Sequence, residues 1–231
     1  MNEPGDYRRH SLDQPAPVEG FDLSIYVQGG DWQLARARSG REFAFIECAR
    51  GTTLGAYFPA QWEACGQAGF IRGTYQRLFS TFSAEHQAET FLAAVDRTGA
   101  SLEPTDLPPV LDAEFDDDSH VMAVQASAFA EMLHVWVERV GSAFGRRPLI
   151  YTGPNFWNCY MSGMDEFAGL PLWLCQWNVA VAAPPQPWNG WTFWQYAAER
   201  SVPGFDHPVD YDRFVGSRDE LLRFIASTHV R

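Results

Sequence analysis

The chain has 231 residues, of which 46% are hydrophobic and 15% aromatic, so it can bury a large core and is not a disordered protein. This length fits either one large domain or two small ones. The net charge of −12 argues against nucleic acid and anionic membrane surfaces as partners, because both are bound by clustered Lys and Arg.

The N-terminal residues 1–19 are polar and rich in Pro and charge, and we expect a flexible extension ahead of the folded region 20–231. The first twenty residues contain no apolar run that could form the core of a signal peptide. Nowhere in the chain do about eighteen apolar residues follow one another, as a membrane-spanning helix would need. We therefore expect synthesis in the cytoplasm without a signal peptide.

Strand and helix patterns alternate along most of the chain. In order, we predict a strand at 20–26, a helix at 31–38, a strand at 42–48, a helix at 57–67, a strand at 70–75, a helix at 84–97, a strand at 110–114, a helix at 121–144, and strands at 148–152, 171–177 and 191–196. Helices between strands imply parallel pairing, hence a barrel or an open doubly wound sheet. Because no Gly-rich phosphate loop follows any strand, we favour a modified barrel.

The stretch 108–114, Pro-Pro-Val-Leu-Asp-Ala-Glu, carries the clearest chemical signal. In a strand, Asp112 and Glu114 would point the same way with Cα atoms roughly 6 to 7 Å apart, which suits two acids acting on one bond. The competing interpretation is that Glu114 caps the following helix and Asp112 is a partly exposed strand residue. Asp22 and Asp210 also lie at or just after apolar segments, so a closed barrel would gather all four acids at one rim.

Four cysteines, Cys48, Cys65, Cys159 and Cys175, stand singly in apolar surroundings without CxxC spacing. This pattern favours buried free thiols over a metal or redox site, and a disulfide stays open if the protein works outside the cytosol. The run 116–118 with His120 could be imagined as a metal site, but a solvated acidic loop is the better interpretation. We therefore expect no metal site.

Five short motifs follow one another within residues 20–216. They are Gly20-Phe21-Asp22-Leu23-Ser24, Leu111-Asp112-Ala113-Glu114, Pro171-Leu172-Trp173-Leu174, Phe193-Trp194-Gln195-Tyr196 and Val209-Asp210. In this order they resemble the G-x-D-x-S, D-x-E, P-L-W, W-Q-Y and V-D motifs of family 25 of the glycoside hydrolases, the lysozymes that cleave the muramic acid bond of peptidoglycan. Each motif alone is weak, whereas five in order are specific. The resemblance implies an α/β fold, namely a single-domain, irregular TIM-like (β/α)5(β)3 barrel. It also implies hydrolysis with no metal and no cofactor.

Carried over to this sequence, the resemblance implies hydrolysis of the β-1,4 bond between N-acetylmuramic acid and N-acetylglucosamine, with Glu114 as general acid. Asp112 would stay ionised beside it, either as the nucleophile or as the stabiliser of an oxazolinium formed by the N-acetyl group of the substrate. Both routes retain configuration. Asp22 and Asp210 match the two remaining acids of the family and would hold charge and hydrogen bonds across the groove.

Aromatic and amide side chains near strand ends are candidate sugar contacts. They are Tyr75, Tyr151, Gln195 and Trp173, although each could as well be core or rim. We expect about half of the Trp cluster, which also includes residues 177, 188, 191 and 194, to be core. No Ser-His-Asp or Cys-His arrangement is suggested by the positions of the six His.

The chain departs from the family pattern around its second and third strands. Glu47 and Arg50 reverse the usual Lys and Glu, and Gln76 follows Tyr75 where the family usually has His. Two alternatives to a muramidase therefore stay open: an inactive relative that only binds glycan, and a hydrolase of another N-acetylated glycan such as chitin. An antibacterial muramidase without a signal peptide would reach the cell wall or periplasm by phage lysis or non-classical export. Its partners would then be peptidoglycan and a lysis, secretion or immunity protein, and we expect a monomer.

Overall fold

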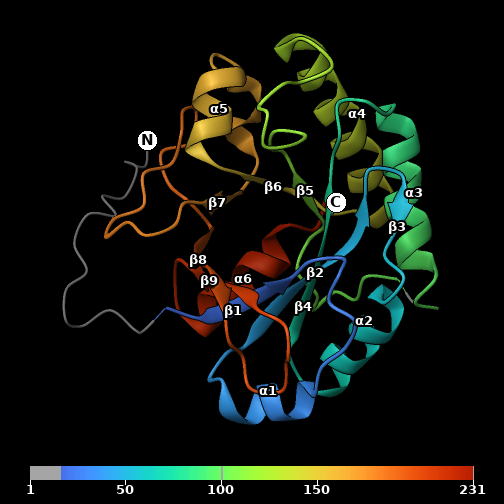
Figure 1. Cartoon of the computed structure of the whole chain (residues 1–231), viewed down its shortest axis with the longest axis vertical. Helices are drawn as coiled ribbons and strands as arrows, with labels where there is room; N and C mark the ends of the chain where they lie inside the picture. The colour runs from blue at the N-terminus through green and yellow to red at the C-terminus, as the bar shows by residue number, and fades with distance from the viewer. Residues whose placement is uncertain (1–16, 100, 231) are drawn as a thin grey trace.

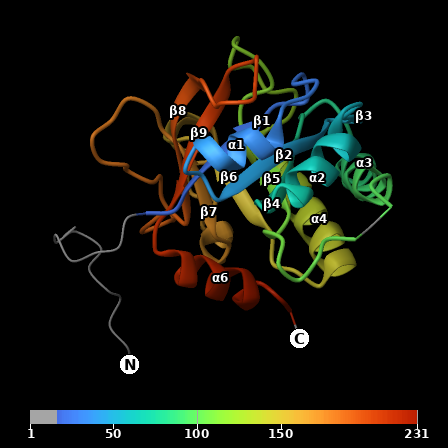
Figure 2. The ribbon, with the colours of Figure 1, turned by 90° about the horizontal axis from the view of Figure 1, so that it is seen from below.

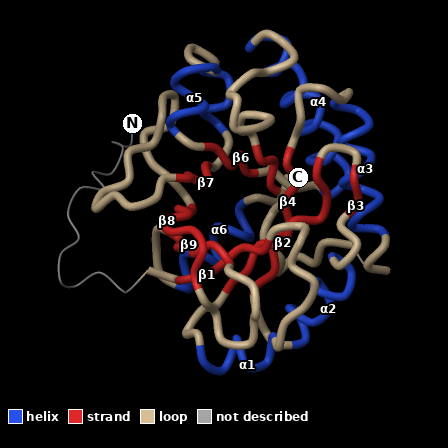
Figure 3. The backbone as a smooth tube through the Cα atoms, viewed as in Figure 1, coloured by secondary structure: helices blue, strands red, loops and turns tan. Residues whose placement is uncertain are grey.

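The computed structural model describes residues 17–99 and 101–230, and their strands close into a barrel surrounded by helices (Figure 1, Figure 3). The strands are β1 (Glu19–Leu23), β2 (Phe43–Arg50), β3 (Thr53–Leu54), β4 (Ile71–Arg77), β5 (Val110–Asp112), β6 (Leu149–Thr152), β7 (Leu172–Cys175), β8 (Phe193–Arg200) and β9 (Val209–Phe214). The sheet runs β1-β9-β8-β7-β6-β5-β4-β2, and a further pairing of β1 with β2 closes it. β3 pairs with β2 outside this ring, as a short hairpin.

Helices follow the early strands and are missing between the last ones. The helices are α1 (Trp32–Arg38), α2 (Phe58–Gln67), α3 (Ala84–Asp96), α4 (Ala126–Phe144), α5 (Pro154–Tyr160), the 3-10 helix η1 (Asp165–Gly169) and α6 (Arg218–Ser227). From β1 to β8 the barrel strands pair in parallel, and β9 is antiparallel to both of its neighbours. Five strand–helix units followed by three strands confirm the predicted irregular (β/α)5(β)3 barrel.

Local sequence signals explain where several helices begin and end. The side chain of Asp31 accepts a hydrogen bond from Leu34 N at the start of α1, and Ser217 forms a capping box with Glu220 at the start of α6. α4 ends at Gly145, whose φ of 59° lies in the left-handed region that glycine adopts readily. Among the described residues, no helix combines the length and apolar character needed to cross a membrane.

Aromatic side chains fill the barrel interior. Phe45 stacks on Trp173 with ring centroids 4.2 Å apart, and Phe43 packs edge-on against Phe193. Room for these rings comes from Gly20 and Gly73, where an added Cβ would lie 2.3 Å from the rings of Phe43 and Phe45, respectively. α6 lies across one end of the barrel (Figure 2) and adds its apolar face to this core. Chemistry is therefore left to the opposite end, where the parallel strands finish.

Several predicted boundaries were wrong. Residues 1–16 of the expected extension lie outside the described residues, but Val18 is buried and pairs with Phe214 in β9, and Glu19 already belongs to β1. β5 ends at Asp112 instead of continuing to Glu114. The helix expected from residue 121 begins at Ala126, because the preceding segment is a loop. The short elements α5 and β3, and α6 after the last strand, were not predicted.

Candidate active site

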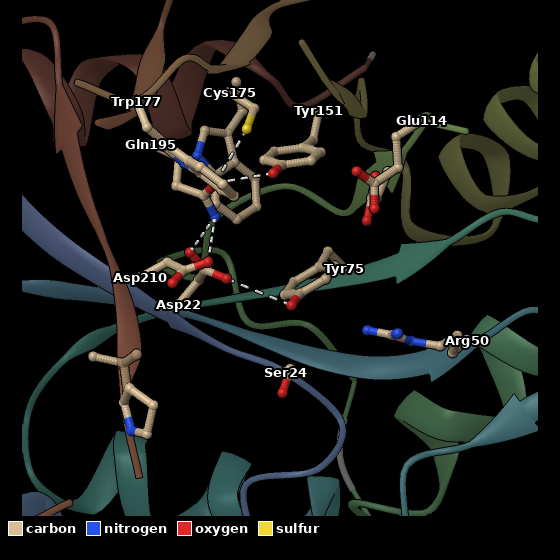
Figure 4. A pocket seen from close by; sticks show the side chains of 14 residues that line it. Asp22, Ser24, Arg50, Tyr75, Glu114, Tyr151, Cys175, Trp177, Gln195 and Asp210 are labelled. Atoms are coloured by element: carbon tan, nitrogen blue, oxygen red, sulfur yellow. Dashed lines mark hydrogen bonds between the residues drawn. The ribbon is translucent and has the colours of Figure 1, made fainter. Parts of the chain in front are cut away.

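The carboxyl ends of the strands surround a pocket of about 240 Å³ (Figure 4). All eight residues that sequence analysis selected as catalytic or sugar-contacting line it. They are Asp22, Tyr75, Asp112, Glu114, Tyr151, Trp173, Gln195 and Asp210. Barrel closure thus brings together side chains that lie up to 188 positions apart in the chain, from residue 22 to residue 210.

One side of the pocket carries Asp112 and Glu114. Asp112 is buried, and its Oδ1 has no hydrogen-bond partner in the described part of the chain. Glu114 lies beyond the strand but still faces the pocket, because Ala113 N donates to Tyr151 O and keeps the backbone alongside β6. The Glu114 side chain is 35% exposed and forms an ion pair with Arg77, with Nη1 and Oε1 3.1 Å apart. One carboxyl is therefore enclosed and the other is open to a ligand.

The pKa values of these two acids are coupled. Burial raises the pKa of Asp112 well above its usual range, and the neighbouring Glu114 raises it further. Burial also raises the pKa of Glu114, although Arg77 opposes this shift. Each carboxylate in such a pair disfavours ionisation of the other, so the two acids titrate together. The roles expected from the sequence, Glu114 as general acid and Asp112 ionised beside it, stay predictions.

The opposite side of the pocket is organised around the amide of Gln195. Its Nε2 donates to Asp22 Oδ2 at 2.7 Å and to Asp210 Oδ2 at 3.4 Å, and its Oε1 accepts from Tyr151 Oη and Trp177 Nε1, both at 2.9 Å. Figure 4 shows this network between the two carboxyls and the aromatic rings. Gln195 and Tyr151, predicted as sugar contacts, are thus already hydrogen-bonded to each other.

The two remaining predicted sugar contacts are also tied into the barrel. Tyr75 Oη donates to Leu23 O at 3.2 Å and lies 3.5 Å from Asp22 Oδ1. Trp173 is only 1% exposed and stacks on Phe45, so it forms the pocket floor and offers no open ring face. Trp177 is 45% exposed and is the better stacking surface for a sugar.

Sequence analysis missed Asp212 on β9. This side chain is fully buried, and its Oδ1 accepts a hydrogen bond from Trp173 Nε1 at 2.8 Å. Its Oδ2 has no hydrogen-bond partner among the described residues, and the carboxyl of Asp22 lies close enough to raise the pKa of Asp212. Burial, reinforced by Asp210, raises the pKa of Asp22 to about 8, and burial raises that of Asp212 well above its usual range. The i, i+2 spacing from Asp210 to Asp212 was the signal, the same as in the pair Asp112 and Glu114.

Residues 21–205 match the sequence profile of the glycosyl hydrolases family 25. The chain belongs to this family. The Escherichia coli protein YegX is 30% identical over 213 residues, which cover 90% of this chain and 73% of YegX. An N,O-diacetylmuramidase of Arthroderma benhamiae is 31% identical over 210 residues, covering 90% of this chain and 86% of that enzyme. The structure of a bacterial lysozyme from Streptomyces coelicolor has a TM-score of 0.83 at 29% identity and covers 92% of this chain and 99% of its own.

Membership of family 25 makes this chain a glycoside hydrolase. The structure also explains how this chain accommodates the reversed charges at Glu47 and Arg50. Glu47 is buried, and its two carboxylate oxygens accept from Arg50 Nε at 2.7 Å and Nη2 at 2.8 Å. Ile25 N donates a third hydrogen bond to Glu47 at 2.8 Å. The reversed charges therefore form an internal ion pair, and Arg50 lines the pocket.

The Gln76 departure lies away from the pocket. Its amide donates to Gly51 O and Gln87 O, and its Oε1 accepts from Trp136 Nε1 at 2.6 Å. Gln76 is therefore a buried link between β4 and the surrounding helices. It does not line the pocket and has no direct part in the site.

The cysteines and the acidic loop have structural explanations. All four cysteines are free, and Cys159 is exposed, so the expectation of burial was wrong there because the short helix α5 was not predicted. Asp116 accepts hydrogen bonds from the backbone and hydroxyl of Ser80, which anchors the loop before α4. Within 17–99 and 101–230, no group of three or more His, Cys, Asp or Glu is placed to hold a metal ion.

Proposed function

We propose that this glycoside hydrolase is a muramidase that cleaves the β-1,4 bond between N-acetylmuramic acid and N-acetylglucosamine in peptidoglycan. The observation that carries the proposal is the carboxyl pair of Asp112 and Glu114, which faces Asp22 and Asp210 across one pocket at the barrel rim. The named muramidase and lysozyme relatives in the same family support peptidoglycan as the substrate.

Glu114 is the proposed general acid. A sugar bound over its partly exposed side chain displaces the water that stabilises the carboxylate, which raises the pKa of Glu114 further. In the bound state the proton of the pair therefore lies on Glu114, which donates it to the leaving glycosidic oxygen. Arg77 holds the carboxyl in place and also donates to Phe115 O at 2.7 Å, so the loop that carries Glu114 is fixed.

Asp112 is left ionised when the proton of the pair lies on Glu114. It then stabilises the positive charge that develops on the sugar, either by direct attack or by steadying an oxazolinium formed by the N-acetyl group. In both cases the ionised Glu114 next activates water and recovers its proton. Asp22 and Asp210, held together by Gln195, orient the substrate from the opposite wall.

The decisive experiment is Glu114→Gln, which keeps the shape of the side chain and removes the transferable proton. Release of new muramic acid reducing ends from peptidoglycan should fall roughly a hundredfold to ten-thousandfold while binding persists. Glu138→Gln, a substitution of an exposed residue on α4, is the matched control and should leave the rate unchanged. A wild-type protein that binds peptidoglycan without releasing reducing ends would establish the glycan-binding alternative.

Chitin provides the test of the other alternative. If the wild-type protein cuts chitin oligosaccharides and leaves peptidoglycan intact, the enzyme is a hydrolase of N-acetylglucosamine polymers instead. For the muramidase we further propose action in the cell wall or periplasm, after phage lysis or specialised secretion. Neighbouring genes for a holin, a secretion component or an immunity protein would separate these routes.

A further inference from the structure

Arg50 is the one cationic side chain among the described residues that line the pocket. The same pocket is lined by four carboxyl groups, those of Asp22, Asp112, Glu114 and Asp210. Such a surface repels any anionic substrate unless a cation offsets the repulsion where the substrate's own charge lies. The position of Arg50 therefore bears directly on which glycans can enter.

The guanidinium of Arg50 is bound along one edge and open along the other. Nε and Nη2 donate to the two oxygens of Glu47, whereas Nη1 has no hydrogen-bond acceptor within the described residues. Figure 4 shows the guanidinium directed into the pocket, toward the side where Tyr75 and Ser24 lie. The ring of Tyr26 lies 5.1 Å from the guanidinium carbon and is 69% exposed. Arg50 therefore gains a cation–π contact on its solvent side, and its open edge stays accessible.

Fixing one edge of an arginine prepares the other edge for an anion. The Glu47 pair removes the rotamer freedom that a binding arginine would otherwise lose, and Ile25 N holds Glu47 in turn. A guanidinium offers planar N–H donors that match the two oxygens of a carboxylate. N-acetylmuramic acid differs from N-acetylglucosamine by a lactyl ether that ends in a carboxyl group. Where no stem peptide is attached through an amide bond, this group is a free carboxylate and separates muramyl glycans from neutral chitin.

We infer that the open edge of Arg50 binds a carboxylate carried by the muramyl residue and so selects anionic glycan strands over neutral ones. This inference rests on the proposed muramidase function and names the chemical group that the site recognises. Arg50 is a specificity-determining residue here, whereas proton transfer stays with Glu114 and Asp112. The alternative is that Arg50 only neutralises buried Glu47, in which case it contributes nothing to selection.

The test uses two substrates that differ in one group. Peptide-free muramyl strands carry free lactyl carboxylates, and the same strands converted to methylamides do not. For the wild-type protein, kcat/KM should be higher on the carboxylate strands, and Arg50→Gln should reduce this preference roughly tenfold to a hundredfold. Arg50→Lys should keep part of the preference, because it retains the charge and loses the planar fork. Arg139→Gln, which breaks an exposed ion pair with Glu89, is the control and should keep the preference.

Two further measurements keep the result interpretable. Glu47→Gln combined with Arg50→Gln removes the pair without leaving a buried carboxylate alone, and it should lose the preference to the same extent. Calorimetric binding of both strands to Glu114→Gln reports selection without turnover, so an absence of hydrolysis would overturn the muramidase proposal alone. Equal binding of the two strands, or an unchanged preference in Arg50→Gln, would overturn the role of Arg50.

Discussion

Two buried aspartates, one ahead of strand β5 and one at its end, lie in contrasting environments. Asp106, four residues before the strand, accepts hydrogen bonds from Arg72 Nε and Nη2 at 2.9 Å each and from the backbone N–H of Glu103 at 2.8 Å. Asp112, at the end of the strand, has an acidic neighbour in Glu114 and an Oδ1 without a partner among the described residues. A distance of six residues therefore separates a satisfied carboxylate from an unsatisfied one.

The contrast distinguishes Asp106, whose carboxylate stabilises the fold, from Asp112, whose carboxyl is available for catalysis. Burial raises the pKa of both aspartates, but Arg72 opposes the rise at Asp106 while Glu114 adds to it at Asp112. Removing one partner of a buried, hydrogen-bonded ion pair is strongly destabilising, because it leaves the other charge without compensation. An unsatisfied carboxyl in a pocket costs stability, and such groups are concentrated at functional sites.

The largest expected effect is on activity, at the unsatisfied end. Asp112→Asn should lower the rate of glycan cleavage roughly a hundredfold to a thousandfold, because it deletes the charge that stabilises the developing positive sugar. The free energy of unfolding should stay the same or rise, since a buried acid without a full set of partners becomes neutral. Reducing-end release and denaturant unfolding of the same preparation measure both effects. A fully active Asp112→Asn protein would show that Asp112 has no catalytic role.

The next effect is on stability, at the satisfied end. Asp106→Asn leaves the Arg72 guanidinium without its counter-ion, and the free energy of unfolding should fall by about 3 kcal/mol. The melting temperature should drop by roughly 5 to 10 °C for a domain of this size. Asp96→Asn, at the exposed end of α3, is the control and should change stability little. If correctly folded Asp106→Asn lost activity at unchanged stability, the assignment of Asp106 to the fold instead of to catalysis would be wrong.

The sequence predicted the acidic rim because its determinants are local. Asp22 lies one residue before the end of β1 and Asp112 ends β5, and parallel strands in a barrel bring these ends together. The alternation of strands and helices predicted parallel pairing and most element positions up to β8, with a barrel and an open doubly wound sheet as alternatives. The closing strand β9, which is antiparallel to both neighbours, was not predicted from this pattern. The boundary at Glu114 was misjudged because the pairing of β5 with β6 ends at Asp112, after which Ala113 N donates one more hydrogen bond to Tyr151 O.

Contacts between strands could not be predicted from the sequence in the same way. Trp173 was expected to contact sugar, but its ring is covered by Phe45, which lies 128 positions earlier in the chain. The carboxyl of Asp212 meets that of Asp22 only because β9 pairs with β1 across the closure of the barrel. Which face of a side chain stays open depends on partners that only the closed barrel brings together.

A smaller effect concerns pH and the cluster of Asp22, Asp210 and Asp212. The folded-state pKa of Asp22 is about 8 against an ordinary value of 3.8, so between these values the folded state holds a proton that the unfolded state has lost. Stability therefore falls as pH rises through this window, by about 1 to 3 kcal/mol from pH 5 to pH 7. Asp212→Asn should flatten the fall by removing one carboxyl while keeping a donor to Asp22. Denaturant titrations at both pH values measure it, and a rise in wild-type stability over this window would contradict the assignment.

The smallest expected effect is that of a chelator. It tests whether the unsatisfied carboxyls of the pocket bind a metal cation instead of a sugar. Within the described residues the acids of the pocket form no group of three metal ligands, and Asp116 of the nearby loop is hydrogen-bonded to Ser80. A hydrolase that works by proton transfer between carboxyls needs no metal. Cleavage of peptidoglycan should therefore continue unchanged in excess EDTA. If EDTA abolished activity and a divalent cation restored it, the loop 116–120 would have to supply metal ligands. The proton-transfer role of Asp112 and Glu114 would then be wrong, because a bound cation would hold both carboxylates ionised.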